Sequence, residues 1–94
     1  MSDAPILNEA EGRFELVEDG ELAELTFRRV DTRLVLIHTG VPDALEGRGV
    51  GGRLVQAAVD YAIAEALTIV PRCPFARSWL ERHPDVAATV SIAE

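Results

Sequence analysis

The chain has 94 residues, of which 48% are hydrophobic and 27% are charged, and its formal net charge is −7 at pH 7. A chain of this length forms one small domain, residues 1–94, and its hydrophobic fraction is enough for one core and too high for a disordered chain. The negative charge argues against a general nucleic-acid-binding protein, because neutralising phosphates needs a surplus of basic residues. An acidic surface is compatible with a cationic substrate such as an amine.

The sequence also predicts where the protein works and with what it assembles. A single cysteine, Cys73, cannot form an internal disulfide, which fits a reducing cytosol. No apolar run is long enough to span a membrane, and the first residues show no basic region followed by an apolar one, so we expect no signal peptide. We therefore expect a cytoplasmic protein with no membrane or nucleic-acid partner and no metal site. So short a chain has little surface for a large obligate interface, which predicts a monomer or a weak dimer.

The first half of the chain predicts three antiparallel strands. Residues 1–12 have few periodic apolar positions and predict an arm or the start of an edge strand. The next segments alternate with period two, as half-buried strands do, and an Asp-Gly turn joins the first two. The third strand is apolar on both faces until His38, which predicts a central strand covered on both sides. The predicted strands are 13–17, 22–28 and 34–39, with turns at 18–20 and 31–32.

The second half predicts two helices and one more strand. A helix is expected over about 51–66, and the β-rich segment 67–70 follows it and ends at Pro71. Pro74 suits the first turn of a second helix, which is expected to end near His83 and Pro84. Phe75, Trp79 and Leu80 are expected to form the buried stripe of that helix, with the wall of a pocket as the alternative position for Phe75 and Trp79. Residues 85–94 show no pattern. The fold class is therefore α+β: a mostly antiparallel sheet, a crossover helix after the third strand, and a short C-terminal helix.

The segment from Gly47 to Gly52 holds four glycines in six residues between a predicted strand and a predicted helix. This geometry offers several backbone N–H groups to a phosphate, and the positive end of the helix dipole adds to the attraction. The segment fits the G-x-G-x-x-G pattern of dinucleotide-binding proteins, but hairpins precede it and no acidic ribose-binding residue ends the next strand. The Walker pattern fails because no Lys-Ser or Lys-Thr follows. A plain flexible turn is the remaining alternative.

Three stretches of the chain, taken together, resemble the GNAT N-acetyltransferase superfamily, and in particular its small single-domain subgroup. They are residues 36–42, 46–54 and 69–75, and the resemblance extends from about Phe14 to Pro84. The acetyl-CoA-binding pattern of the superfamily, Arg/Gln-x-x-Gly-x-Gly/Ala, falls on residues 46–51. Glu46 departs from its first position, so the resemblance implies the backbone contacts with the cofactor and does not extend to a side-chain contact from this residue.

The resemblance implies transfer of an acetyl group from acetyl-CoA to an amine, which is either a small molecule or a peptide. It implies that backbone N–H groups of the glycine-rich loop bind the pyrophosphate, and that the end of the central strand, around Thr39 and Val41, pairs with the pantetheine arm. The residues expected to bind the pyrophosphate are Arg48, Gly49, Val50, Gly51, Gly52 and Arg53.

The transfer requires a base for the ammonium and an acid for the departing thiolate. Larger members of the superfamily often use a tyrosine as the acid, but Tyr61 lies mid-helix and is expected in the core. The resemblance implies His38 and Cys73 as the alternatives. Histidine is a residue type that suits a base at neutral pH, so His38 either serves as the base or only fills the face of its strand. Cys73, the expected N-cap of the second helix, is a transient acetyl acceptor, a general acid or simply a small buried hydrophobe.

Two further predictions concern His83 and the function class that competes with an acetyltransferase. His83 is expected to cap carbonyl groups at the end of the second helix. The competing class is an acyl-CoA-binding or interaction module of the same fold with little or no activity. Its basis is the absent catalytic tyrosine and the short length of chain available for an acceptor pocket.

Overall fold

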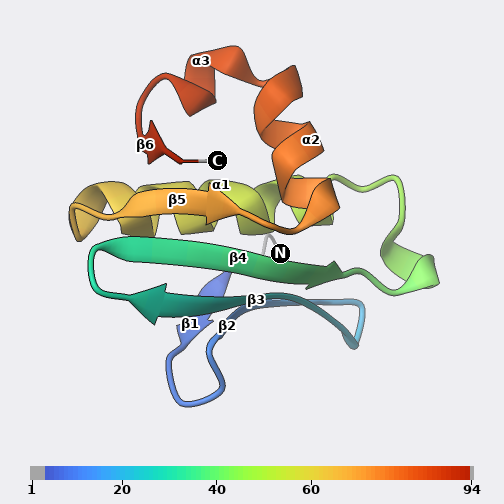
Figure 1. Ribbon diagram of the computed structural model, residues 1–94. Helices are drawn as coiled ribbons and strands as arrows, with labels where there is room; N and C mark the ends of the chain where they lie inside the picture. Colours follow the sequence, from blue (N-terminus) through green and yellow to red (C-terminus); the bar gives the residue numbers. More distant parts are fainter. Residues whose placement is uncertain (1–3, 94) are drawn as a thin grey trace.

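The computed structural model describes residues 4–93, which form one six-stranded sheet with helices on one of its faces (Figure 1). The strands follow the order of the chain, β1-β2-β3-β4-β5-β6. Pairing is antiparallel from β1 to β4, and parallel between β4 and β5 and between β5 and β6. The strands are β1 (Ile6–Asn8), β2 (Arg13–Glu18), β3 (Glu21–Val30), β4 (Arg33–Gly40), β5 (Thr68–Pro71) and β6 (Ser91–Ile92); the helices are η1 (Asp43–Leu45, a 3₁₀ turn), α1 (Val50–Ala64), α2 (Pro74–Arg82) and α3 (Pro84–Ala87).

The predicted hairpins are confirmed, and β1 is the predicted edge strand. Asp19 and Gly20 have φ values of 53° and 75°, as a two-residue turn between right-twisted strands requires. Asp31 has a φ of 54° in the second turn. Asp and Gly are the residue types that adopt this backbone region with little strain, so the sequence sets both turns locally.

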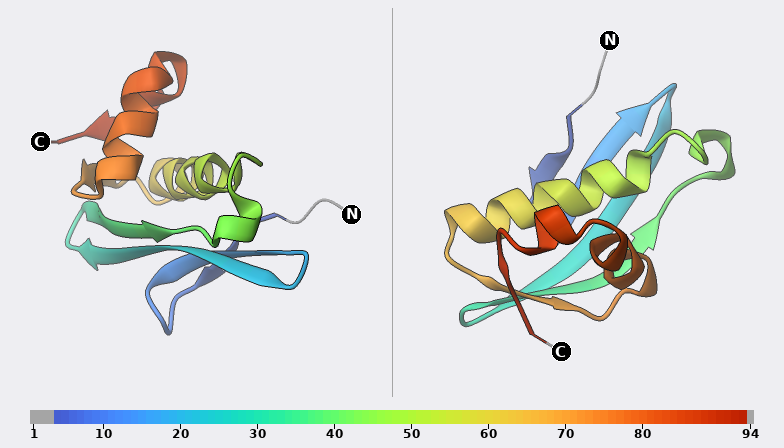
Figure 2. Two further views of the ribbon diagram at one scale, coloured as in Figure 1. Left: turned by 90° about the vertical axis from the view of Figure 1, so that its right-hand side faces the viewer. Right: turned by 90° about the horizontal axis from the view of Figure 1, so that it is seen from above.

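The strand β4 is central, between β3 and β5, but the prediction that it is covered on both sides is wrong. Leu34 and Leu36 are fully buried, whereas Ile37 is 42% exposed and Val35 only half-buried. In the view from above, α1, α2 and α3 all lie in front of the strands, on the same face of the sheet (Figure 2). The opposite face, which we call the open face, has no helix against it among residues 4–93.

The helix α1 makes the crossover from β4 to β5 and supplies one side of the core. Its buried residues Leu54, Val55 and Ala58 recur at helical spacing and pack against apolar side chains of β2, β3 and β4. It ends two residues earlier than predicted, because Ala66 adopts a φ of 56° and turns the chain into β5. No helix within residues 4–93 is long and apolar enough to cross a membrane.

The C-terminal helix α2 starts at Pro74 with Cys73 as its N-cap, as predicted. Its predicted buried stripe is wrong in part: Leu80 is buried together with Ala76, while Phe75 is 38% exposed and Trp79 half-buried. Both rings contact the start of α1, and Trp79 also packs against the edge of the core. The helix α3 and the two-residue strand β6 were not predicted, because such short elements leave no periodic pattern.

Candidate functional site

A groove of ≈ 900 Å³ lies where β4 ends, between the start of α1 and helix α2. It is lined by Thr39 of β4, Val41 and residues 45–47 of the following loop, residues 49–53 and Gln56 of the start of α1, and Phe75, Trp79, Arg82 and His83 of α2 and its C-terminal end. Among the predicted cofactor-binding residues the groove thus brings together Thr39, Val41, Gly49, Val50, Gly51, Gly52 and Arg53, and Arg48 does not line it.

The start of α1 presents backbone N–H groups to this groove. Gly49 is the N-cap with a φ of 74°, so the first four N–H groups, those of residues 49–52, have no acceptor within the helix. The Arg48 N–H already donates to the Leu45 carbonyl at 3.3 Å, and the Arg53 N–H to the Gly49 carbonyl at 3.1 Å. Of the N–H groups predicted to bind the pyrophosphate, from Arg48 to Arg53, only those of residues 49–52 therefore remain available. They lie at the positive end of the helix dipole.

The four glycines of the loop are needed for two different reasons. Gly47 and Gly49 have φ values of 83° and 74° and open space where a Cβ would be, so backbone conformation alone favours glycine there. A Cβ on Gly51 would lie 2.7 Å from Cζ of Phe75, and one on Gly52 would lie 2.5 Å from Nε1 of Trp79. The second pair of glycines therefore lets the aromatic rings of α2 approach the backbone of α1.

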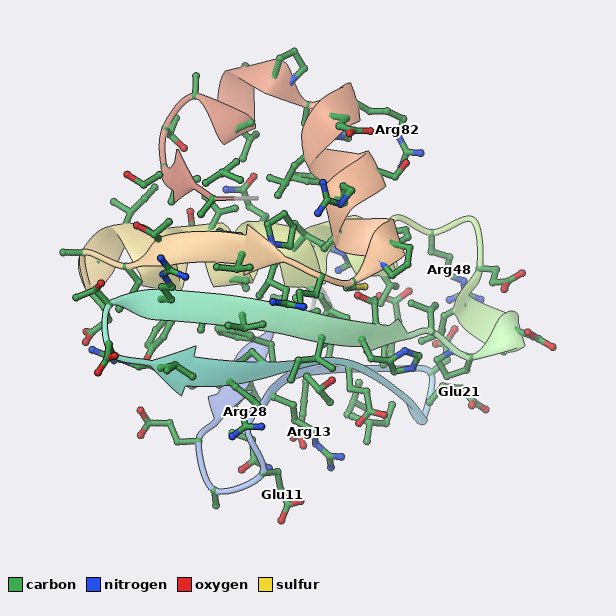
Figure 3. All side chains as sticks on the ribbon, viewed as in Figure 1. Glu11, Arg13, Glu21, Arg28, Arg48 and Arg82 are labelled. Carbon is green, nitrogen blue, oxygen red and sulfur yellow. The ribbon has the colours of Figure 1, made fainter. Side chains whose placement is uncertain are left out.

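Ion pairs hold the glycine-rich loop against the turn between β2 and β3. The Arg53 guanidinium donates to Glu18 at 2.9 Å, and Arg48 donates to Glu18 at 3.2 Å and also to Asp19 (Arg48 is labelled in Figure 3). The hydrogen bonds from Arg53 and Arg48 lower the pKa of Glu18, and those to Asp19 and Glu18 raise the pKa of Arg48. Sequence reasoning missed these pairs, since partners about 30 residues apart leave no local signal.

The edge of β4 that faces β5 loses its partner strand near the groove. Pairing with β5 ends at Leu36, opposite Pro71, whereas β4 continues to Gly40 in its pairing with β3. The carbonyl of Leu36 accepts the N–H groups of both Arg72 and Cys73, after which the chain leaves the sheet as α2. From residue 37 to residue 40, this edge of β4 has no paired strand among the residues that the structure describes.

Cys73 lies next to the groove but does not line it. Its side chain is 2% exposed, and its Sγ lies 3.2 Å from Oγ1 of Thr39, which does line the groove. Either atom can donate this hydrogen bond. As the N-cap of α2, Cys73 makes no capping hydrogen bond through its side chain. Thr39 therefore lies between the thiol of Cys73 and the groove, and it contacts both.

His38 lies on the open face of the sheet, away from the groove. A β-bulge opposite Thr26 and Phe27 inserts Ile37 into β4, so that Phe27 pairs with Leu36 and Thr26 pairs with His38. Paired residues share a face, and the Thr26 face is the open one. The structure thus brings Cys73 together with Thr39 and leaves His38 on the other side of the strand.

Tyr61 and His83 lie where the sequence predicts them. Tyr61 packs its ring against Phe14 and Phe27, and its hydroxyl accepts a hydrogen bond from Arg29 at 2.8 Å. His83 caps α2 through Nδ1 and the Trp79 carbonyl at 2.7 Å. It also lines the groove and stacks on Trp79, which the sequence did not predict. Within residues 4–93 no group of three or more His, Cys, Asp and Glu side chains could hold a metal ion.

Comparison with known proteins bears on what a groove of this kind serves. A solution structure of a GCN5-like N-acetyltransferase candidate from Staphylococcus aureus matches with a TM-score of 0.73 and 34% identity, over 96% of this chain and 89% of that one. The proteins named NATD1 from Gallus gallus and Homo sapiens are 36% identical over 63 residues, 66% of this chain. The match spans little more than half of those relatives, 57% and 56% of their lengths.

The family model points to the same group. The model described as GCN5-related N-acetyl-transferase matches residues 13–90, which is most of the chain and includes the sheet, the glycine-rich loop and α2. This confirms the resemblance drawn from the three sequence stretches, and the fold with it. The chain belongs to the GCN5-related N-acetyltransferase family.

Proposed function

We propose that this protein transfers an acetyl group from acetyl-CoA to an amine of a small molecule or a peptide. The observation that carries the proposal is the groove, in which four backbone N–H groups at the start of α1 lie beside the edge of β4 that has lost its partner. Members of this family generally use acetyl-CoA, and a diphosphate is the kind of anion that a helix N-terminus binds.

The residues of the groove fit the parts of acetyl-CoA by their chemistry. In this proposal the N–H groups of residues 49–52 bind the pyrophosphate, and the edge of β4 near Thr39 and Val41 pairs with the amides of the pantetheine arm. Phe75 provides apolar contact beside it. When bound, acetyl-CoA supplies an acetyl group as a thioester, and the amine forms the new C–N bond as the C–S bond breaks.

Two proton transfers remain for the chain to perform. We propose that His38 accepts the proton of the amine on the open face, and that Cys73, with Thr39, delivers a proton toward the leaving thiolate from the groove side. The two roles require the acceptor amine to approach β4 from the open face, beyond residue 36, where residues 4–93 place no strand between the open face and the groove. We further propose that the protein acts in the cytoplasm as a monomer or weak dimer.

The first test is calorimetric titration with acetyl-CoA, with NAD as the control ligand. We expect saturable binding of acetyl-CoA and none of NAD. A screen of amine acceptors, read by release of the CoA thiol, then measures turnover. If no binding is seen at millimolar acetyl-CoA, the proposal is contradicted. The glycine-rich loop is then best explained as a structural turn.

Variants test the catalytic assignment separately from binding. Cys73→Ser and His38→Ala are each expected to lower turnover about 10²–10⁴-fold, the usual contribution of a positioned acid or base, with little change in acetyl-CoA affinity. Tyr61→Phe, which removes only a hydroxyl bonded to Arg29 away from the groove, is the control and should leave turnover unchanged. Unchanged turnover in both test variants would show that the catalytic groups lie elsewhere.

The second candidate function is binding of acyl-CoA at the same groove without acetyl transfer. The burial of Cys73 and the position of His38 on the opposite face favour an acyl-CoA-binding module with little or no transferase activity. Binding of acetyl-CoA without thiol release across the amine screen is the outcome that favours this second function.

A further inference from the structure

On the open face, two neighbouring residue pairs of β3 and β4 bring a carboxylate and an imidazole to the same small space. Thr26 pairs with His38, and Glu24 pairs with Gly40. All four residues point to the open face, because paired residues of neighbouring strands share a face and so do residues two apart on one strand. Since Gly40 has no side chain, the space above it is left between the side chains of His38 and Glu24.

The space above Gly40 is bordered by a nitrogen and an oxygen atom that suit an ammonium group. A Cβ on Gly40 would lie 3.5 Å from Nε2 of His38 and 3.7 Å from Oε2 of Glu24. These are ordinary contact distances, so an atom fits there without displacing either side chain and contacts both. An ammonium nitrogen in this space has a carboxylate as acceptor for one N–H and an imidazole nitrogen for another.

A salt bridge fixes the Glu24 carboxylate and leaves one of its oxygens beside this space. Arg13 of β2 donates through Nη1 to Oε1 of Glu24 at 2.8 Å, and Oε2 is the oxygen that lies beside Gly40. Arg13 also donates through Nε to Glu15 at 2.6 Å, so one guanidinium serves two carboxylates and these three side chains keep an excess of negative charge. Figure 3 shows Arg13 on the side of the sheet opposite the helices. The cluster therefore attracts a cation to the open face.

We propose that the space between Glu24 and His38 binds the ammonium group of the acceptor, and that the acceptor is an aliphatic primary amine rather than an aromatic one. Glu24 holds the charged nitrogen by a charge-assisted hydrogen bond, and a second N–H points at Nε2 of His38. This inference rests on the proposed function, in which His38 accepts the proton of the amine. An aliphatic amine carries the positive charge at pH 7 that Glu24 selects, whereas an aromatic amine such as aniline is neutral there.

The test measures binding of cyclohexylamine, which is protonated at pH 7, and of aniline, its neutral aromatic counterpart. The chain has two histidines, His38 and His83, so the ring signals of both can be followed together by NMR. Cyclohexylamine at fixed pH is expected to shift the His38 signals saturably. His83 lines the groove on the other face and is the internal control, whose signals should not move. Aniline at the same concentrations should leave His38 unchanged.

Two glutamate variants test the role of the carboxylate. Glu24→Gln removes the charge and keeps the size of the side chain, so it should weaken cyclohexylamine binding about 10-fold, the effect of one charge-assisted hydrogen bond. Glu15→Gln is the matched control, because Glu15 shares Arg13 with Glu24 and pairs with Glu24 across the strands, but lies one strand farther from His38. Its dissociation constant for cyclohexylamine should stay close to that of the wild type.

Gly40→Ala tests the space itself. The backbone of Gly40 does not have a positive φ, and the added Cβ makes only ordinary contacts, so the variant should unfold at the temperature of the wild type. Its methyl group occupies the position assigned to the ammonium nitrogen, so cyclohexylamine should no longer shift the His38 signals. Wild-type binding in Gly40→Ala would place the cation elsewhere and overturn the site.

The outcomes separate this inference from the proposed function, because the titration needs neither acetyl-CoA nor turnover. If cyclohexylamine leaves His38 unchanged, or binds Glu24→Gln as tightly as the wild type, the ammonium site is wrong, and acetyl-CoA binding with thiol release can still stand. If aniline shifts His38 as cyclohexylamine does, the selection for aliphatic amines is wrong. If cyclohexylamine binds as expected and acetyl-CoA does not bind, the proposed function is lost and the ammonium site remains.

Discussion

The two faces of β4 have nearly the same composition and opposite surroundings. Leu34 and Leu36 are fully buried under α1, whereas Val35 is half-buried and Ile37 is 42% exposed on the open face. Connectivity explains the difference: the crossover from β4 to the parallel strand β5 places α1 on one face, and α2 and α3 return to that same face (Figure 2). A strand that is apolar on both sides therefore indicates a central position, and coverage depends on where the helices go.

The same two faces divide the candidate catalytic residues. Strict alternation from Leu34 and Leu36 would put His38 on the helix-covered face, and the bulge at Ile37 reverses this. Thr39 takes the position on the covered face instead, where it contacts Cys73. One inserted residue thus decides which side chain of β4 reaches the groove.

The largest expected difference between the faces is in stability. Leu36→Ala should lower the free energy of unfolding by about 2–5 kcal/mol, because it leaves a cavity in the core. Ile37→Ala should cost less than about 1 kcal/mol, because its side chain is already partly in water. Urea denaturation of both variants measures the difference.

A cost for Ile37→Ala that matches Leu36→Ala would break the comparison. Such a result would mean that something covers the open face in solution, and a dependence of the unfolding midpoint on protein concentration would identify it as a second copy of the chain.

The features that the sequence predicted well are those with local causes. The turn at Asp19 and Gly20 follows from the backbone preferences of two residues, and Pro74 marks the start of α2 through its fixed φ. The bulge at Ile37 and the strand β6 depend on pairing between distant segments. No local pattern encodes that pairing, so alternation alone assigns the residues of β4 beyond the bulge to the wrong face.

A smaller effect is expected when a glycine of the groove, Gly49, is compared with a glycine of a distant turn, Gly20. Gly49 and Gly20 have φ values of 74° and 75° and open space for a Cβ, so Gly49→Ala and Gly20→Ala should each cost about 1 kcal/mol of stability. Thermal unfolding should show this as a fall of roughly 4–8 °C in Tm. Only Gly49→Ala should also weaken acetyl-CoA binding, because it disturbs the amides at the start of α1. Equal affinities in the two variants would count against those amides as the pyrophosphate site.

The geometry of the groove, like the fold, follows from the sequence where its causes are local. A loop of four glycines before a helix predicts free amides whatever the rest of the chain does. The packing of Phe75 and Trp79 on Gly51 and Gly52 joins segments more than 20 residues apart, and so helical periodicity alone suggested that both rings were core. The stacked Trp79–His83 pair, by contrast, has an i, i+4 spacing that could have indicated it.

The smallest expected effect is on stability, and it concerns two glutamates that form ion pairs on opposite sides of the sheet. Arg53 and Arg48 lower the pKa of Glu18 beside the glycine-rich loop, and Arg13 and Asn8 lower that of Glu15 on the open face. A folded-state pKa below the ordinary glutamate value of 4.5 stabilises the protein above that pH, and the stabilisation disappears as the pH falls through the lowered pKa. Glu18→Gln and Glu15→Gln should therefore each be slightly less stable than the wild type at pH 7 and should approach it in urea midpoint below about pH 4.5.

Acetyl-CoA affinity then distinguishes the two variants. The pairs of Glu18 join the turn of β2 and β3 to a loop about 30 residues away, so their loss should loosen the start of α1 and change the affinity at pH 7. Glu15 bonds to Arg13 and Asn8, away from the groove, so its variant should bind acetyl-CoA as the wild type does. A change of equal size in both variants would show that ion pairs anywhere on the sheet affect the groove, and the hairpin contact would then have no special role in holding the loop.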